Sequence, residues 1–337
     1  MSDNNNHWRR AIVLGLVAAA AGGAAYMALR RKKQPDPPKR ILVTQLWTYP
    51  VKSLGGVITS SQELDKCGFL YDREWIVLRA LDNALLTQRE CPKMKLVHAA
   101  VNRSNGVLEL RAAERSDVLS IPLTPPTKVL EKDLVPISLR ELPSRYVRES
   151  EAAAKWLTCV LGVECFLART HADRNPSDRE RFRPIVKTDD RIRSQEHSTL
   201  HIITEEGLEW AQKNAGDPTI NVARFRPNIV VSGVPFPLED DWAVFKIGNI
   251  NCRMSKCCGR CTVVSINDQG ERHPDQQPNK LLQAVHAKSI PIPDPDPPRG
   301  CFGIQCFHEN NGKITVGDEV VVTETASSRG GEKIVPL

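Results

Sequence analysis

Residues 96–111 read LVHAAVNRSNGVLELR, a stretch typical of an antiparallel β-hairpin. Two β-prone runs, Leu96–Val101 and Val107–Arg111, flank Asn105-Gly106, a dipeptide that favours tight hairpin turns. Further short β-prone runs lie at 41–47 and 75–79. Together these runs predict an antiparallel β-rich unit in the first half of the chain.

The segment after residue 149 has the pattern of a helix that docks on this unit. Ser150 is a good N-cap, and Trp156, Leu157, Val160 and Leu161 share one helical face. Between residues 169 and 193, eight basic and five acidic residues predict a solvated loop or a domain junction. The second half predicts a helix near 205–213 and strands at 228–232, 242–247, 261–266 and 313–323. The fold class is therefore α+β, with two β-rich units and few long helices.

The N-terminus carries a candidate membrane anchor. Residues 11–29 hold no charge, and at about 1.5 Å per residue such a helix nearly crosses a hydrocarbon core of about 30 Å. Two basic residues precede it and six follow within a dozen positions, a bias that places the body on the cytosolic side. We expect a head at 1–10, a transmembrane helix at 11–29 and a basic, Pro-rich linker at 30–40. A cleaved signal peptide and a mitochondrial presequence are the alternatives.

The net positive charge of the chain lies in this N-terminal segment. The 337 residues carry a formal net charge of +6, and the first 40 hold eight Lys and Arg against two acids. The remainder is balanced, which removes the main support for binding to a nucleic-acid backbone, and we expect no nucleic acid as a partner. No haem-attachment, phosphate-loop or dinucleotide motif occurs in the sequence. We expect no pyridoxal phosphate either.

Four of the ten cysteines crowd into ten residues: Cys252, Cys257, Cys258 and Cys261. They could form a structural zinc knuckle. Cys258 and Cys261 also have the spacing of a redox dithiol, although such motifs usually open a helix after a strand. In a third interpretation Cys261 alone is a thiolate metal ligand beside Arg260. In the fourth, all are buried structural cysteines.

Residues 258–264, Cys-Gly-Arg-Cys-Thr-Val-Val, resemble the Cys-Ser-Arg-Cys segment of MOSC domains, the molybdenum-cofactor-binding modules of the mitochondrial amidoxime reducing components. Four other blocks resemble this family in the same order. Residues 47–53 resemble the opening of its N-terminal β-barrel domain, 71–75 its following strand, 225–230 its central element and 317–320 its closing hairpin. The resemblance implies a MOSC N-terminal β-barrel domain at 41–168, a β-rich MOSC domain that binds the molybdenum cofactor at 185–325, and a tail at 326–337.

The resemblance also implies a molybdopterin cofactor whose molybdenum is held by the pterin and by one protein cysteine. That cysteine is Cys261, as metal ligand and catalytic residue. A phosphate away from water needs fixed cations, and arginine gives planar, bidentate contacts. The cofactor-binding residues that the resemblance implies are Lys52, Ser53, Arg73, His197, Ser198, Arg226, Asn228, Gly259, Arg260 and Gln305.

Three of these positions depart from the family pattern. Gly259 stands where the family usually has Ser, so a hydroxyl contact is lost. His197-Ser198 aligns with a Thr-Ser pair, and Gln305 stands where Tyr is common. His197 is also the only histidine near the expected site, which makes it a candidate proton donor.

The function implied by the resemblance is that of an oxidoreductase. It reduces N-hydroxylated compounds (amidoximes, hydroxamates and N-hydroxyguanidines) to their N–H forms, with electrons from cytochrome b5 and its NADH-dependent reductase. The expected location is the mitochondrial outer membrane, with a single span and the body facing the cytosol, and another intracellular membrane is the alternative. The alternative function is a non-catalytic carrier of the molybdenum cofactor or of its sulfur.

Overall fold

The computed structural model describes residues 40–125, 128–288 and 298–329. The predicted head at 1–10, the span at 11–29 and the linker except for Arg40 lie outside these residues, as do residues 330–337 of the tail. Within the described ranges, no helix has the length and apolar character needed to cross a membrane. The described residues form one compact unit by their contacts.

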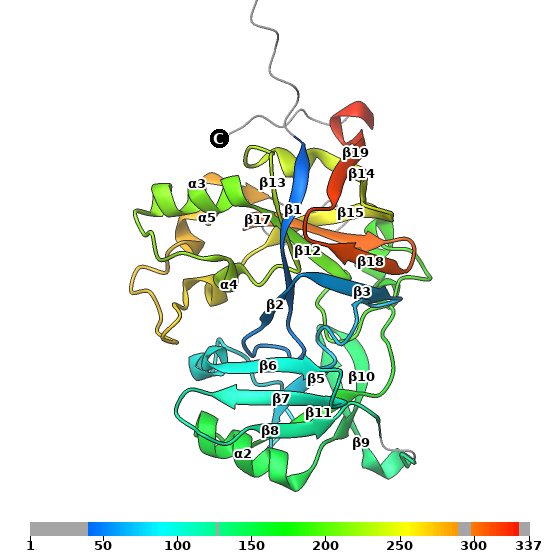
Figure 1. Ribbon diagram of the computed structural model, residues 1–337, viewed down its shortest axis with the longest axis vertical. Coiled ribbons are helices and arrows are strands. Elements are labelled where there is room, and N and C mark those ends of the chain that lie inside the picture. Colours follow the sequence, from blue (N-terminus) through cyan, green and yellow to red (C-terminus); the bar gives the residue numbers. More distant parts are fainter. Residues whose placement is uncertain (1–39, 126–127, 289–297, 330–337) are drawn as a thin grey trace, which may run out of the picture. The chain divides into compact units, whose positions relative to one another are not determined.

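A closed barrel is the largest element of this unit (Figure 1). Within the described residues, seven strands form a ring in which each pairs with two neighbours, and only β12 and β13 run parallel. Closure leaves no free sheet edge on the ring. In ring order the strands are β12 (Leu200–Thr204), β13 (Ile229–Ser232), β1 (Ile41–Thr48), β19 (Glu319–Thr325), β14 (Trp242–Ile247), β15 (Ile250–Gly259) and β17 (Arg299–His308).

Gly303 permits the ring to close. Its φ is +72°, and a Cβ at this position would lie 2.2 Å from the carbonyl oxygen of Ile202 on β12. Only glycine allows β17 to approach β12 this closely. The barrel interior is apolar, with Leu46, Ile202 and Phe245 fully buried in one cluster.

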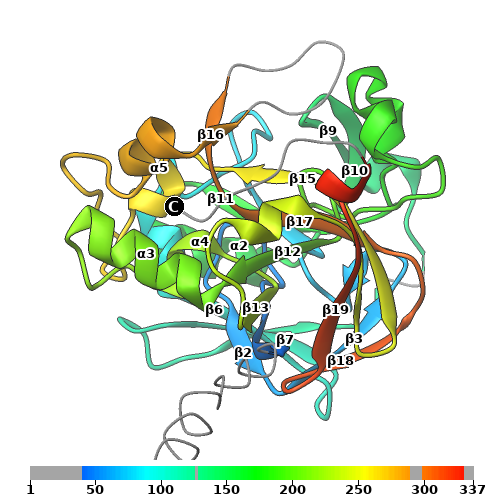
Figure 2. The same cartoon turned by 90° about the horizontal axis from the view of Figure 1, so that it is seen from above.

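Three helices cover the outside of the barrel, as Figure 2 shows for α3 and α5. They are α3 (Glu205–Ala215), α4 (Val222–Phe225) and α5 (Asn279–Val285). Their apolar residues form a second core with Val230 of β13 and Phe302 of β17. The helix predicted near 205–213 is confirmed as α3.

The remaining strands form three smaller sheets. Their orders are β5-β11-β10-β9, β6-β7-β8 and β18-β3-β4, while β2 and β16 extend the large sheet. Their bounds are β2 (Val57–Thr59), β3 (Ser61–Asp65), β4 (Gly68–Phe69), β5 (Trp75–Arg79), β6 (Val97–Asn102), β7 (Val107–Ala112), β8 (Leu119–Pro122), β9 (Leu134–Leu139), β10 (Leu142–Arg148), β11 (Cys165–Thr170), β16 (Ala287–Lys288) and β18 (Gly312–Thr315). The hairpin predicted around Asn105-Gly106 is confirmed as β6–β7.

Helix α2 (Glu151–Leu161) packs into the apolar core of the first half of the chain, together with Trp75 of β5 and Leu110 of β7. The Ser150 side chain accepts a hydrogen bond from the Ala153 N–H, and the helix ends at Gly162 with φ +70°. The predicted helix and its cap are therefore confirmed. The short 3₁₀ turns are η1 (Pro92–Leu96), η2 (Glu131–Asp133), η3 (Pro176–Asp178), η4 (Glu180–Ile185), η5 (Leu238–Asp241), η6 (Thr262–Ser265) and η7 (Ser327–Arg329).

Two predicted strand elements near the C-terminus are wrong. Residues 262–265 form the 3₁₀ turn η6 instead of a strand, because Val264 turns into the core of the outer helices while Cys261 and Val263 line a cavity. The strand predicted at 313–323 is interrupted after Thr315, and among the described residues β18 and β19 do not pair as the closing hairpin implied for 317–320. β18 pairs with β3, and β19 pairs with β1 and β14.

The loop predicted at 169–193 is confirmed, since the only regular elements among the described residues between β11 and β12 are 3₁₀ turns, but its solvation is wrong for several arginines. Arg174, Arg179 and Arg193 are at most 9% exposed. The Arg174 guanidinium donates to the carbonyls of Leu139 and Arg193, at 3.0 and 2.6 Å. Charge composition does not reveal that buried backbone carbonyls satisfy these guanidinium groups.

Candidate functional site

A cleft with a cavity of about 190 Å³ lies between the turns that carry Lys52, Ser53 and Arg73 and one end of the barrel. Ten of the eleven predicted site residues line it, although they come from six separate segments of the chain. Among the described residues of its lining, six are Lys or Arg and one is a carboxylate, Glu196. The predicted residues in the lining are Lys52, Ser53, Arg73, Ser198, Arg226, Asn228, Gly259, Arg260, Cys261 and Gln305.

His197 is the predicted residue that lies elsewhere. It lines an adjoining cavity of about 300 Å³. The expectation that His197 is the only histidine near the site is wrong, because His201 on β12 lines the cleft. The sequence places His201 in the strand that follows Ser198. Whether its side chain points into the cleft depends on how that strand lies in the barrel.

Three predicted residues have left-handed backbone. The φ angles of Ser53, Arg73 and Arg226 are +70°, +51° and +54°. Non-glycine residues in this region cost about 1–3 kcal/mol each and concentrate at functional sites. Arg226 adopts this conformation as the C-cap of α4, where its N–H donates to the carbonyl of Val222. The turns are thereby held in conformations that place these side chains in the cleft.

Two guanidinium groups lie against the ring of Tyr49. Those of Arg73 and Arg226 are 4.5 and 4.3 Å from its centroid. Arg73 donates to the buried carboxylate of Asp72 at 2.7 Å, whereas Arg226 donates to the carbonyl of Leu54. Burial, and then the nearby Arg73 charge, lower the pKa of Arg226 to about 10. The pair therefore holds an excess positive charge away from water.

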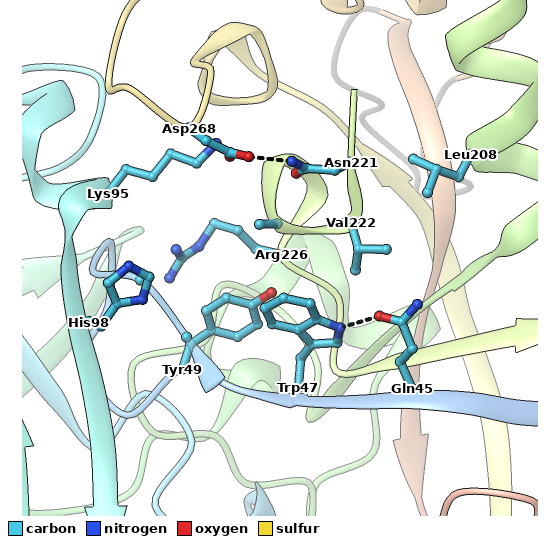
Figure 3. A pocket seen from close by; sticks show the side chains of 13 residues that line it. Gln45, Trp47, Tyr49, Lys95, His98, Leu208, Asn221, Val222, Arg226 and Asp268 are labelled. Carbon is cyan, nitrogen blue, oxygen red and sulfur yellow. Dashed lines mark hydrogen bonds and ion pairs between the residues drawn. The ribbon is translucent and has the colours of Figure 1, made fainter. Parts of the chain in front are cut away.

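Tyr49 and Arg226 also border a second cavity of about 510 Å³ (Figure 3). The Trp47 and Tyr49 rings stack there at 6.1 Å, and Lys95 pairs with Asp268 across from them. The Tyr49 hydroxyl is buried without a hydrogen-bond partner among the described residues. The sequence patterns gave no indication of this cavity.

Lys52 reaches the cleft from the turn after β1. Its ammonium donates to the carbonyl of Ser194 at 2.9 Å and lies 3.7 Å from the Glu196 carboxylate. Burial lowers the pKa of Lys52 to about 8, partly offset by Glu196. Lys52 is therefore largely charged at neutral pH.

The amide of Asn228 holds the barrel wall. Its oxygen accepts from the backbone N–H of His201 at 3.2 Å, and its nitrogen donates to the carbonyl of Trp47 at 3.4 Å. One amide hydrogen and one lone pair remain for a ligand edge. Asn228 thus joins β12 to β1 at the floor of the cleft.

Cys258 sits in a strongly cationic setting that the sequence interpretation missed. The Arg260 guanidinium donates to its sulfur at 2.8 Å, and the Gln305 amide lies 3.5 Å from it. Burial alone would raise the pKa of Cys258, but Arg260, His201 and Lys256 outweigh it and hold the pKa at about 6. The signal lay in the Cys-x-Arg spacing, which keeps a guanidinium close to the thiol at the end of β15.

Cys261 lies just past the end of β15, at the start of η6, half-buried in the cleft. Its side chain makes no hydrogen bond to the described residues. A soft thiolate without other partners suits a soft metal. Gly259 between the two cysteines has ordinary backbone, and a Cβ there would meet Arg299 at 3.4 Å, an ordinary contact. The fold does not require glycine at this position.

The zinc-knuckle interpretation does not fit the geometry. Cys257 and Cys258 line different cavities, and Cys252 is buried in the barrel interior. In the part of the chain that the structure describes, no three His, Cys, Asp or Glu side chains are grouped to hold a metal. All ten cysteines are described and are free.

The cleft fits an anionic group that can accept hydrogen bonds, such as a pyranopterin phosphate. Its charges are mostly cationic, and the Nε of Arg260 is buried without a partner among the described residues. Such an orphaned donor is costly unless a ligand satisfies it. Cys261 adds one soft ligand.

Comparisons with known proteins agree with this architecture. Residues 40–164 match the MOSC N-terminal beta barrel domain and residues 189–321 match the MOSC domain. The mitochondrial amidoxime-reducing component 1 of Mus musculus is 28% identical over 82% of this chain and 81% of its own, and that of Homo sapiens is 29% identical over 82% of both. The molybdenum cofactor sulfurase of Oryza sativa is 26% identical over 71% of this chain, which spans 30% of that protein. With its MOSC N-terminal and MOSC domains in tandem, the chain belongs to the MOSC-domain protein family.

Proposed function

We propose that this protein is a molybdenum cofactor-dependent oxidoreductase that reduces amidoximes, hydroxamates and N-hydroxyguanidines to their N–H forms. The observation that carries the proposal is the convergence of ten separately predicted residues on one cationic cleft. Relatives named as amidoxime-reducing components align over about four fifths of both chains, which supports a reductase. Reduction of an amidoxime to an amidine takes two electrons and two protons and releases one water.

The residues of the cleft have separable roles in this proposal. Lys52, Arg73, Arg226 and Arg260 bind the phosphate and ring edges of molybdopterin, where charge-assisted hydrogen bonds are strongest. Cys261 ligates molybdenum through its thiolate. When bound, the cofactor supplies two-electron chemistry at the N–O bond of the substrate. Ser53, Ser198, Asn228, Gly259 and Gln305 complete the binding surface.

The remaining parts of the proposal concern partners and location. Electrons come from cytochrome b5, reduced by NADH-cytochrome b5 reductase. Residues 11–29 anchor the protein in the mitochondrial outer membrane, with the body in the cytosol. We also propose a division of the body into an N-terminal domain at 41–168 and a MOSC domain at 185–325.

The test uses a protein of residues 34–337 with reconstituted cytochrome b5, its reductase and NADH. Benzamidoxime should be converted to benzamidine, measured by chromatography. The protein should contain about one molybdenum and one pterin per chain and no stoichiometric zinc. Cys261→Ser is the matched control without turnover. A molybdenum-loaded protein that leaves benzamidoxime unchanged would count against an oxidoreductase. Release of the full chain from isolated membranes by salt alone would contradict the anchor.

A second candidate function is a carrier of the cofactor or of its sulfur. The observation that favours it is the low pKa of Cys258, because a thiolate at neutral pH is the form that attacks the outer sulfur of a donor persulfide, whose thiolate then leaves. Relatives named molybdenum cofactor sulfurase include a region similar to this chain. Delivery of molybdenum from the loaded protein to an acceptor that lacks it, without benzamidoxime turnover, would select this function.

A further inference from the structure

The 300 Å³ cavity that holds His197 adjoins the cofactor cleft. Both cavities share Arg140, Glu196, Gly259 and Gln305 in their lining. A molecule in this cavity therefore lies beside the cleft, on the side of Gln305. The proposed cofactor residues account for the cleft and leave this adjoining cavity unexplained.

Lys256 is a buried cation in the lining of this cavity. It is 6% exposed, and among the described residues its ammonium has no ion pair or hydrogen bond with a carboxylate or carbonyl. Burial lowers its pKa, while Cys258 and Cys301 nearby oppose that effect. Its Nζ is not fully buried, so an oxygen of a molecule in the cavity can reach it and pair with its charge.

Arg179 is the second buried cation of the cavity. It is 5% exposed and donates to the carbonyl of Glu196 at 2.9 Å and to Nδ1 of His197 at 3.1 Å. Its Nε is buried without a partner among the described residues. No carboxylate of the described residues pairs with Arg179.

His197 adds a third donor. Because its Nδ1 accepts from a guanidinium, the neutral ring carries its proton on Nε2. Burial keeps the pKa of His197 low, and the charges of Lys256 and Arg179 add to this. Among the other polar groups of the lining, Gln305 Oε1 is buried without a partner among the described residues, while the charged groups are paired. Arg140 pairs with Glu196, and Lys288 pairs with Asp240.

We propose that this cavity binds a carboxylate on the substrate, held by Lys256, Arg179 and His197, so that the protein acts on anionic N-hydroxylated compounds. This inference rests on the proposed function and names its substrate class. The same donors could hold a phosphate of the cofactor, and the experiment separates these two sources.

The test compares kcat/KM for 4-carboxybenzamidoxime with kcat/KM for benzamidoxime in the loaded protein. The ratio should be about ten or more, the effect of one charge-assisted hydrogen bond to a buried cation. Lys256→Met should reduce the ratio to about one, and Lys256→Arg should restore most of it. Lys246→Met removes an exposed lysine on the neighbouring strand β14 and should leave the ratio unchanged.

Benzoate provides a measurement that does not depend on turnover. Calorimetry should show benzoate binding to the wild-type protein, weakened about tenfold or more in Lys256→Met. Benzoate binding without turnover of either amidoxime would leave the anion site standing and refute the oxidoreductase. A ratio near one in the wild-type protein would overturn the inference. Loss of pterin from Lys256→Met, with the substrate ratio unchanged, would also overturn it and assign the anion to the cofactor.

Discussion

The Arg260 guanidinium donates a hydrogen bond to the Cys258 sulfur at 2.8 Å. The two residues stand near the end of β15 and both line the cleft, three and one positions before Cys261. This contact gives the cleft two cysteines of different character. The protein stabilises the thiolate of Cys258 through Arg260, whereas the sulfur of Cys261 has no hydrogen bond to the described residues and can bind a ligand.

The first prediction follows from that contact. Because the pKa of Cys258 is held at about 6, its alkylation by iodoacetamide in the cofactor-free protein should rise with pH around 6 and level off above 7. Arg260→Met removes the largest cationic influence and should move this midpoint upward. Mass spectrometry of the modified peptide measures both profiles. A midpoint that does not respond to Arg260→Met would show that the guanidinium does not set this pKa.

The second prediction concerns the two arginines against Tyr49. Arg73→Ala and Arg226→Ala should each lower pterin content, because a charge-assisted hydrogen bond contributes about 1.5–3 kcal/mol, or about tenfold or more in affinity. Alanine keeps the Cβ, so the backbone strain at φ +51° and +54° is unchanged. The unfolding midpoint should shift little in Arg226→Ala, but it should fall in Arg73→Ala, because the buried Asp72 carboxylate then loses its ion-pair partner. The matched control is Arg111→Ala on β7, where the side chain is 61% exposed. Equal pterin content in all three variants would mean that the cofactor phosphate binds elsewhere.

The third prediction is a pH dependence of stability. His308 Nε2 donates to the carbonyl of Asp65, and burial holds the pKa of His308 below its ordinary 6.5. The folded state therefore favours the neutral ring, while the unfolded chain takes up a proton near pH 6.5. The stabilisation is present above pH 6.5 and is lost as the pH falls through the lowered folded pKa. Urea unfolding at pH 7.5 and 5.5 should show a smaller loss of unfolding free energy in His308→Gln, and an equal loss would exclude this histidine as a source.

The sequence predicted local elements well where the determinants are local. The cap at Ser150 and the Asn105-Gly106 turn act within a few residues, and both elements form as expected. The run Thr262-Val263-Val264 has strand propensity, but contacts of Val264 with the outer helices impose a 3₁₀ turn instead. The place of β1 within the barrel and the closure of β17 on β12 at Gly303 depend on contacts far apart in the chain.

The candidate site was predictable only through the resemblance. Lys52, Arg226 and Arg260 are each unremarkable in the sequence, and their convergence depends on the barrel and on left-handed turns. His201 was missed, and the cationic setting of Cys258 was not predicted, because the directions of both side chains depend on strand register. Lys256 and Arg179 were missed because charge composition does not reveal burial.

The last prediction separates the cysteines. If Cys261 alone ligates molybdenum, Cys261→Ser should abolish reductase activity and lower molybdenum content, because a poorly ionised hydroxyl does not replace a soft thiolate. Cys257→Ser should retain both, since Cys257 lines the other cavity. Cys258→Ser should retain molybdenum and a substantial part of the activity, because Arg260 then loses a counter-charge but the metal keeps its ligand. A dithiol mechanism requires equal sensitivity at Cys258 and Cys261. Measuring activity and molybdenum in the three single variants decides the matter, and equal loss of molybdenum at Cys258 and Cys261 would show that Cys261 is not the sole ligand.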